Sequence, residues 1–216
     1  MKHQAVLFDL DGTLLNTLQD VADAVNHGLG DLGFPQHRTA TYRGLIGEGR
    51  DVLALRALPK NHQDQDTARK LLSRINDEYA ICWANNTRPY PGVPEMLDSL
   101  TANDIKMVVL SNKADDLTKM CVTKLLSRWH FTLIAGARPS VPNKPDPTGA
   151  LQIAKELDIT PSKFLYLGDS GIDMETAKGA GMYPVGALWG FRSAKELLAA
   201  GAKTLIAYPE ELLHFI

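Results

Sequence analysis

The chain has 216 residues, of which 44% are hydrophobic and 22% charged, and its formal net charge is −2. These values are typical of a globular protein whose length allows one core plus a smaller inserted domain. Because there is no dense run of Lys or Arg, we expect neither nucleic acid nor a membrane as a partner. Two cysteines without metal-binding spacing, and no apolar run of membrane length, favour a cytoplasmic protein with reduced thiols.

The first predicted element is a short apolar strand at residues 5–8, followed by Asp9 and Asp11. Residues 15–85 then show helix-spaced apolar positions at 18–32, 51–58 and 64–83, with no convincing strand between them. This pattern predicts a helical insertion of residues 15–85. The chain would return to the core near Tyr90-Pro91-Gly92, where prolines favour a stiff hinge.

The rest of the chain alternates between short apolar runs and helical patterns. The predicted strands lie at 106–110, 164–167, 182–185 and 203–206, and the predicted helices at 93–100, 115–126, 147–157, 174–180, 194–200 and from 209. Strands that alternate with helices predict an α/β fold with a doubly wound parallel sheet. The expected core therefore comprises residues 1–14 and 86–216.

Polar side chains follow the predicted strands where each strand ends, which is where open α/β sheets bind their ligands. They are Asp9 and Asp11, then Ser111, Asn112 and Lys113, and finally Asp169 with Asp173, joined by Lys144 at the start of a helix. Clustered Asp9, Asp11 and Asp169 would raise one another's pKa unless a cation compensates their charge. Oxygen ligands of this kind suit Mg²⁺, which keeps coordination sites for water and phosphate.

These residues match a known family. The chain resembles the haloacid dehalogenase superfamily, and within it the capped phosphatases similar to phosphoglycolate phosphatase. The matching motifs, in the family's order, are DLDGT at 9–13, LSNK at 110–113, Lys144 within NKPDP, and GDSGID at 168–173, with YPGV at 90–93 and WGF at 189–191 also similar. The helical insertion lies where these enzymes carry their cap domain, so the resemblance implies a Rossmann-like core with a helical cap.

The resemblance implies a role for each residue. Asp9 would be the nucleophile that forms an aspartyl-phosphate, and Asp11 would protonate the leaving alcohol and later deprotonate a water. Asp9, Asp11 and Asp169 would hold Mg²⁺, supported by Asp173. Gly12, Ser111, Asn112 and Lys144 would bind the substrate. Because a halide leaving group needs no proton, the presence of Asp11 favours a phosphate ester.

Each of these residues also has a plainer interpretation. Lys144 could be a solvated lysine, Asp173 a charge at a helix N-terminus, and Ser111 the cap of the next helix. Lys113 is not expected to be catalytic. In the insertion, GLIGEGRDVL at 44–53 resembles a specificity loop in which Arg50 contacts a substrate carboxylate or phosphate, but an exposed arginine is equally supported.

One departure from the family pattern concerns Asn16-Thr17, where many relatives have an acid, and it affects substrate choice or cap hinging. We expect a Mg²⁺-dependent phosphatase for a small phosphorylated metabolite, with phosphoglycolate as the first candidate. A pyrophosphatase and a sugar-phosphate mutase of the same superfamily remain open, as does the choice between monomer and dimer. A phospho-accepting signalling domain disagrees with the length and the inserted helices.

Overall fold

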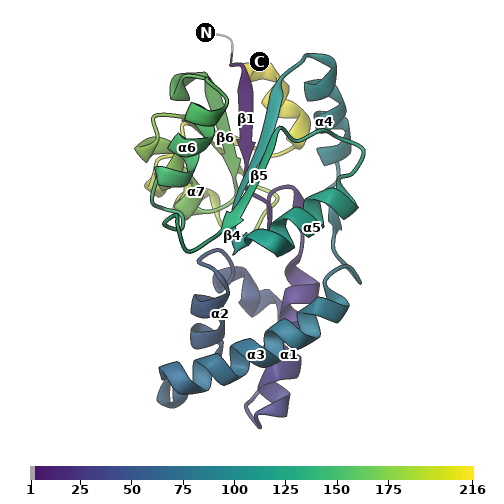
Figure 1. The fold of residues 1–216 in the computed structure, drawn as a ribbon, viewed down its shortest axis with the longest axis vertical. Coiled ribbons are helices and arrows are strands. Elements are labelled where there is room, and N and C mark those ends of the chain that lie inside the picture. The colour runs from purple at the N-terminus through teal and green to yellow at the C-terminus, as the bar shows by residue number, and fades with distance from the viewer. Residues whose placement is uncertain (1–2) are drawn as a thin grey trace. The chain divides into compact units, whose positions relative to one another are not determined.

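The computed structural model describes residues 3–216, which belong to two compact units (Figure 1). The core unit contains the residues up to Leu15 together with Pro89–Ile216, and the helical unit contains Asn16–Arg88. The chain leaves and re-enters the core unit through two short strands that pair with each other, β2 (Leu15–Asn16) and β3 (Arg88–Pro89).

The core unit is built on a six-stranded sheet with the order β5-β4-β1-β6-β7-β8. All neighbouring strands are parallel. The strands are β1 (Ala5–Phe8), β4 (Lys106–Ala114), β5 (Leu133–Ala137), β6 (Phe164–Gly168), β7 (Tyr183–Ala187) and β8 (Thr204–Ile206). Because central strands of a parallel sheet are covered on both faces, they are continuously apolar, as β1 and β6 are.

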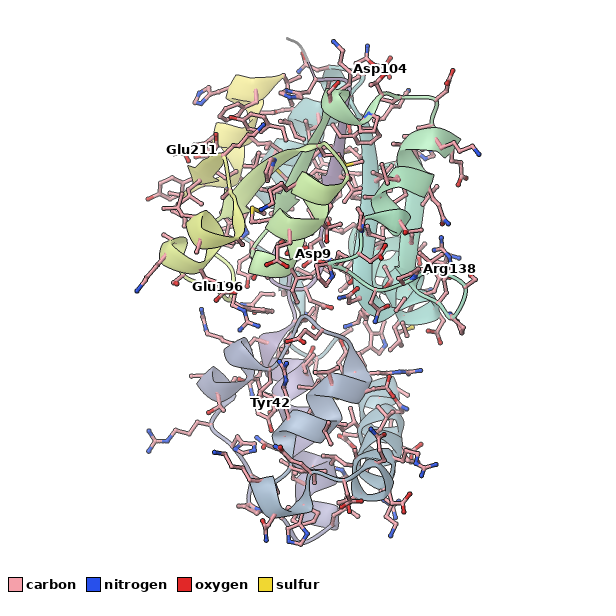
Figure 2. All side chains as sticks on the ribbon, turned by 90° about the vertical axis from the view of Figure 1, so that its left-hand side faces the viewer. Asp9, Tyr42, Asp104, Arg138, Glu196 and Glu211 are labelled. Carbon is pink, nitrogen blue, oxygen red and sulfur yellow. The ribbon has the colours of Figure 1, made fainter. Side chains whose placement is uncertain are left out.

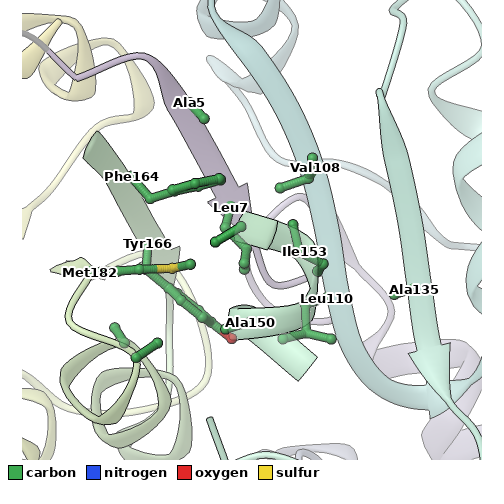
Figure 3. Close-up of a cluster of buried hydrophobic side chains, with 13 residues drawn as sticks. Ala5, Leu7, Val108, Leu110, Ala135, Ala150, Ile153, Phe164, Tyr166 and Met182 are labelled. Atoms are coloured by element: carbon green, nitrogen blue, oxygen red, sulfur yellow. The ribbon is translucent and has the colours of Figure 1, made fainter. Parts of the chain in front are cut away.

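Helices cover both faces of this sheet, with α6 and α7 on one side and α4 and α5 on the other (Figure 1). The core helices are α4 (Val93–Ala102), α5 (Asp115–Leu125), α6 (Thr148–Glu156), α7 (Gly171–Gly179) and α8 (Ala194–Ala200). Alternate residues of the central strands, such as Leu7, Val108 and Tyr166, pack against α6 and α7 (Figure 3). This confirms the predicted doubly wound α/β fold with an inserted helical domain.

Three elements of the core differ from the sequence-based expectation. Strand β5 was not predicted, because Leu-Ile-Ala-Gly-Ala is short and weak in strand formers. Strand β4 continues beyond Leu110 to Ala114, so Ser111 and Asn112 lie within it. The predicted closing helix from Pro209 is a 3₁₀ helix, Pro209–Phe215.

The helical unit contains three α-helices close to the predicted positions. They are α1 (Leu18–Asp31), α2 (Arg50–Ala57) and α3 (Gln65–Cys82), accompanied by 3₁₀ turns at Thr39–Gly44 and Lys60–His62. Asp64 caps α3, since its side chain accepts hydrogen bonds from the backbone N–H groups of Asp66 and Thr67. Within residues 3–216, no helix is both long enough and apolar enough to cross a membrane.

Asp20, in the first turn of α1, forms hydrogen bonds with residues 86–87, near the end of the helical unit. Its buried carboxylate accepts hydrogen bonds from the backbone N–H groups of Asn86 and Thr87, at 2.8–3.0 Å, and from both of their side chains. Burial alone would raise the pKa of Asp20, but the hydrogen bonds from Thr87 and Asn86 hold it below its usual value. Asp20 is therefore a fully satisfied structural acid.

Candidate active site

The strand register places Asp9 between two other polar strand ends. Phe8 pairs with Val109 of β4 on one side and with Leu167 of β6 on the other. The residues that follow these strand positions, including Asp9 and Asp169, therefore meet at the carboxyl end of the sheet, where Figure 2 shows Asp9. The backbone N–H of Asp9 donates to Leu167 O at 2.9 Å, which fixes the residue to β6.

The turn after β1 depends on Gly12. Leu10 O accepts hydrogen bonds from the backbone N–H groups of residues 13–15, which folds the chain tightly after the strand. Gly12 has φ +93°, a left-handed conformation that favours glycine, and a Cβ there would collide with the carboxylate of Asp169. The glycine therefore serves the turn and the close approach of Asp169.

Three buried carboxylates meet at this end of the sheet. One oxygen from each of Asp9, Asp169 and Asp173 lies within 4.8 Å of the others. The expected trio contained Asp11 in place of Asp173, and the structure places the Asp11 carboxylate elsewhere. Asp173 belongs to the group because it lies in the first turn of α7, directly after β6.

Lys144 joins two of these carboxylates. Its ammonium group donates to Asp9 Oδ1 and Asp173 Oδ1, both at 2.7 Å, and to Leu110 O at 3.1 Å. The predicted role was phosphate binding, but these contacts use all three ammonium hydrogens. Lys144 could therefore bind a phosphate only by releasing one of these partners, and in this arrangement it orients the Asp9 carboxylate.

Asn112 holds Lys144 in place. Its side-chain amide donates to Lys144 O at 3.0 Å and accepts from Lys144 N at 2.9 Å, a paired contact with the backbone of one residue. In the structure the amide of Asn112 positions the backbone of Lys144, and the predicted contact of Asn112 with substrate stays a prediction. Ser111, also buried, accepts a hydrogen bond from Lys113 N at 3.2 Å and lines a small cavity together with Asn112 and Lys144.

The electrostatics of the cluster show an excess of negative charge. Burial, followed by the charge of Asp173, raises the pKa of Asp169 to about 7. Burial also raises the pKa of Asp9 well above its usual value, although Lys144 opposes this effect. Burial would lower the pKa of Lys144, but Asp173 and Asp9 raise it well above its usual value. One lysine therefore does not compensate the three carboxylates.

This donor set fits a divalent cation of the Mg²⁺ type. Asp9 and Asp169 offer oxygen ligands at a buried site with excess negative charge. A bound cation would offset the repulsion between carboxylates that helps to raise their pKa values. The oxygens of Asp173 are engaged with Lys144 and with the N–H and hydroxyl groups of Ser170. These contacts engage both oxygens of Asp173, and its expected position outside the metal shell stays a prediction.

Asp11 forms a separate ion pair. The ammonium group of Lys113 lies 3.1 Å from Asp11 Oδ1, and both side chains are largely buried. The Asp11 carboxylate is thus paired with a cation and is not one of the three clustered carboxylates, and its expected roles in proton transfer and metal binding stay predictions. Lys113 was not expected to be catalytic, and its only sequence signal is its position directly after Ser111-Asn112.

Arg50 lies in the helical unit at the first position of α2, where Gly49, with φ +94°, precedes it. Its exposed guanidinium donates to Asn76 Oδ1 of α3 at 3.1 Å. Neighbouring Glu48 pairs with Arg56. The contact with a substrate anion that the sequence suggested for Arg50 stays a prediction.

The chain is similar to known hydrolases over most of its length. The sequence profile of the haloacid dehalogenase-like hydrolases matches residues 6–187. Phosphoglycolate phosphatase from Pseudomonas putida is 32% identical over 205 residues, covering 93% of this chain and 75% of the relative. The enzyme of the same name from Aquifex aeolicus is 31% identical over 188 residues, covering 87% and 86%.

Solved structures show the same fold over nearly the whole chain. A protein from Lactobacillus delbrueckii subsp. bulgaricus, provisionally assigned as a phosphoglycolate phosphatase, superposes with a TM-score of 0.92 at 27% identity, covering 98% of this chain and 97% of that one. CbbY from Rhodobacter sphaeroides, solved in complex with phosphate, has a TM-score of 0.77 at 25% identity, with coverages of 97% and 96%. The chain therefore belongs to the haloacid dehalogenase-like hydrolases and is similar in sequence to phosphatases among them.

Proposed function

We propose that this hydrolase is a Mg²⁺-dependent phosphatase that acts on a small phosphorylated metabolite through an aspartyl-phosphate, with phosphoglycolate as the first candidate substrate. The observation that carries the proposal is the pair of acids on the turn after β1. Asp9 is held by Lys144 within the aspartate cluster, whereas Asp11 is paired with Lys113. Two neighbouring carboxylates in different surroundings can perform different chemistry.

In the proposed reaction, a carboxylate oxygen of Asp9 attacks the phosphorus atom, and the bond between phosphorus and the ester oxygen breaks. Asp11, protonated for this step, gives its proton to the departing alcohol. Asp11 then takes a proton from a water molecule, whose oxygen attacks the phosphorus of the aspartyl-phosphate. Inorganic phosphate leaves and the Asp9 carboxylate is restored.

The other residues support these steps. Lys144 orients Asp9, Asn112 fixes the backbone of Lys144, and the hydroxyl of Ser111 can donate to a phosphate oxygen. Asp9 and Asp169 would hold Mg²⁺, which when bound supplies positive charge to the phosphate oxygens. The helical unit is proposed to be the cap, and the cytoplasmic location remains a prediction from composition.

The proposed function is tested by measuring phosphate release from a panel of phosphate esters with Mg²⁺ and with excess chelator. We expect chelator to abolish turnover, and mass spectrometry of acid-quenched enzyme to place the transient phosphate on Asp9. Asp104→Asn is the matched control for Asp9→Asn, since Asp104 is an exposed acid far from Asp9 in the core unit (Figure 2). Full activity in chelator, or label on Asp11, would contradict the proposal, and a rearranged sugar phosphate as product would identify a mutase.

The substrate class is tested through Arg50. If Arg50 binds the carboxylate of phosphoglycolate, Arg50→Ala should lower kcat/KM for that ester about tenfold or more, the loss typical of a charge-assisted hydrogen bond. An aryl phosphate without a carboxylate should show little change. Arg69→Ala, at an exposed position of α3, serves as the control. Equal losses on the two substrates would mean that Arg50 does not recognise the carboxylate.

A further inference from the structure

The carboxylate of Asp169 is held by two chain segments that are far apart in the sequence. The hydroxyl of Thr13, from the turn after β1, donates to Asp169 Oδ1 at 3.2 Å. The backbone N–H of Phe191, from the loop after β7, donates to Asp169 Oδ2 at 2.6 Å. Each oxygen of this carboxylate therefore has its own donor, and the two donors together fix how the group is turned.

The loop after β7 is also attached to the turn after β1. The indole N–H of Trp189 donates to Thr13 O at 2.9 Å. Thr13, Asp169 and the segment Trp189-Gly190-Phe191 therefore form a closed set of contacts. Because Trp189 stays partly exposed, burial of the indole ring does not by itself account for its place in the loop.

Gly190 allows the loop to approach Asp169 this closely. A Cβ at residue 190 would overlap both the Cβ and the carboxylate of Asp169. A Cβ at Gly12 would also overlap this carboxylate, so two glycines leave space for one side chain. Gly190 does not have a left-handed backbone, so its requirement for glycine is one of space.

We propose that Trp189-Gly190-Phe191 is a positioning segment for the metal site, which fixes the orientation of the Asp169 carboxylate by holding its Oδ2 while Thr13 holds its Oδ1. The inference rests on the proposed function, because it takes Asp169 as a Mg²⁺ ligand. Groups that hydrogen-bond to metal ligands set the orientation of those ligands, and losing such a group typically lowers metal affinity 10–100-fold.

The test measures Mg²⁺ binding directly, without substrate, by isothermal titration calorimetry and by the Mg²⁺-dependent rise in Tm. Gly190→Ala should weaken Mg²⁺ binding about tenfold or more, because the added methyl displaces Asp169 or the loop. Trp189→Phe keeps an aromatic ring but removes the hydrogen bond to Thr13, and should weaken binding about two- to tenfold. In both variants KM for Mg²⁺ should rise more than kcat falls.

Trp129→Phe is the matched control for Trp189→Phe. Trp129 also donates its indole N–H, here to Asp98 Oδ1 at 2.7 Å, but Asp98 lies in α4 and outside the aspartate cluster. Trp129→Phe should lower the stability of the protein by about as much as Trp189→Phe does, and should leave Mg²⁺ binding unchanged. Gly30→Ala, within α1 of the helical unit, controls for the added methyl group.

The outcomes separate this inference from the proposed function. If the unchanged protein does not bind Mg²⁺, the metal assignment itself fails. If it binds Mg²⁺ and a folded Gly190→Ala variant binds it equally well, the positioning role is overturned and the proposed function stands. Should Gly190→Ala fail to fold, Trp189→Phe decides in the same way, with Trp129→Phe as its reference.

Discussion

Asp20 in the helical unit and the Asp9–Asp169–Asp173 cluster in the core unit show two ways of burying a carboxylate. Asp20 is 1% exposed and Asp169 is 2% exposed, so exposure to solvent does not distinguish them. The pKa of Asp20 is nevertheless lowered, whereas that of Asp169 is raised to about 7. Burial acts to raise the pKa of both groups; hydrogen bonds outweigh it at Asp20, and at Asp169 the charge of Asp173 adds to it.

Asp20 is surrounded by neutral donors, and the clustered acids are surrounded by one another. Four donor groups from Asn86 and Thr87 satisfy Asp20 without another charge. The cluster has Lys144 and a few donors for three carboxylates, which leaves uncompensated charge. A crowded, under-compensated set of acids costs stability and is therefore a better indicator of function than a buried acid alone.

The largest expected effect separates the two sites by activity. Asp9→Asn should lower kcat about a thousandfold or more, because the amide is a poor nucleophile, while the protein stays folded. Asp20→Asn should change kcat little in the protein that remains folded. Stopped-time assays of phosphate release, with circular dichroism as a folding check, measure both. Comparable losses of kcat in the two variants would remove the functional distinction.

The second prediction concerns folding stability, for which Asp20 should be important. Asp20→Ala leaves the donors of Asn86 and Thr87 without their acceptor and should lower the free energy of unfolding by about 2–4 kcal/mol. Urea denaturation measures the change. Asp23→Ala, at an exposed position of the same helix, is the control and should cost under about 0.5 kcal/mol. A cost below 1 kcal/mol for Asp20→Ala would show that water replaces the lost acceptor.

The contrast between these acids also marks how far the sequence could predict the molecule. Asp9 and Asp169 were predictable because strand ends of a parallel sheet meet at one edge, and the apolar strands were visible in the sequence. Asp20 gave no signal, since its donors, Asn86 and Thr87, lie at the far end of the insertion. Strand β5 was missed because its apolar pattern is weak.

Side-chain partners were harder to predict than positions. Lys144 and Asn112 were both placed at the site, but their bonds to Asp9, Asp173 and each other depend on tertiary contacts. Lys113 follows two recognised residues and was still set aside, because a lysine beside a strand end is more often solvated. The sequence therefore identifies the chemical groups, whereas the three-dimensional packing decides which group orients which.

A third prediction uses pH to sharpen the comparison. Folded Asp169 ionises near pH 7, whereas in the unfolded chain it ionises near 4, so between these values the folded state binds the extra proton. The free energy of unfolding of the metal-free protein should therefore fall as pH rises from about 4 to 7. Asp20 has the opposite sign: its lowered pKa stabilises the fold above about pH 4 and this contribution is lost at lower pH.

Mg²⁺ should offset the loss of folding stability that repulsion among the clustered carboxylates causes. At a concentration of 100 times Kd it should stabilise the protein by about 2.7 kcal/mol at pH 8 and by clearly less at pH 5, where it competes with protons. Thermal unfolding at both pH values, with and without Mg²⁺, measures this. Asp169→Asn should remove most of the difference. A Mg²⁺ response of equal size at pH 5 and pH 8 would contradict the assignment.

The smallest effect concerns Asp11, which has a charged partner of its own. Lys113→Met should leave Asp11 without its orienting cation and lower kcat for an alkyl phosphate about tenfold, with partial recovery in Lys113→Arg. An aryl phosphate should be less affected, since its leaving group needs little protonation. Equal losses on the two esters would indicate that Lys113 acts on the phosphate and not through Asp11.

The strand order has a consequence for how the chain assembles during synthesis. Ala5 of β1 pairs with Lys106 on one side and Phe164 on the other, so neither neighbour exists when β1 leaves the ribosome. At typical elongation rates of 5–20 residues per second, about 5–20 s pass before the first of them is made. The helical unit, whose helices pack on one another, can fold in that interval. Strand β1, which precedes Asp9, must therefore remain an unpaired apolar segment during this interval, which is when the nascent chain is most exposed to aggregation.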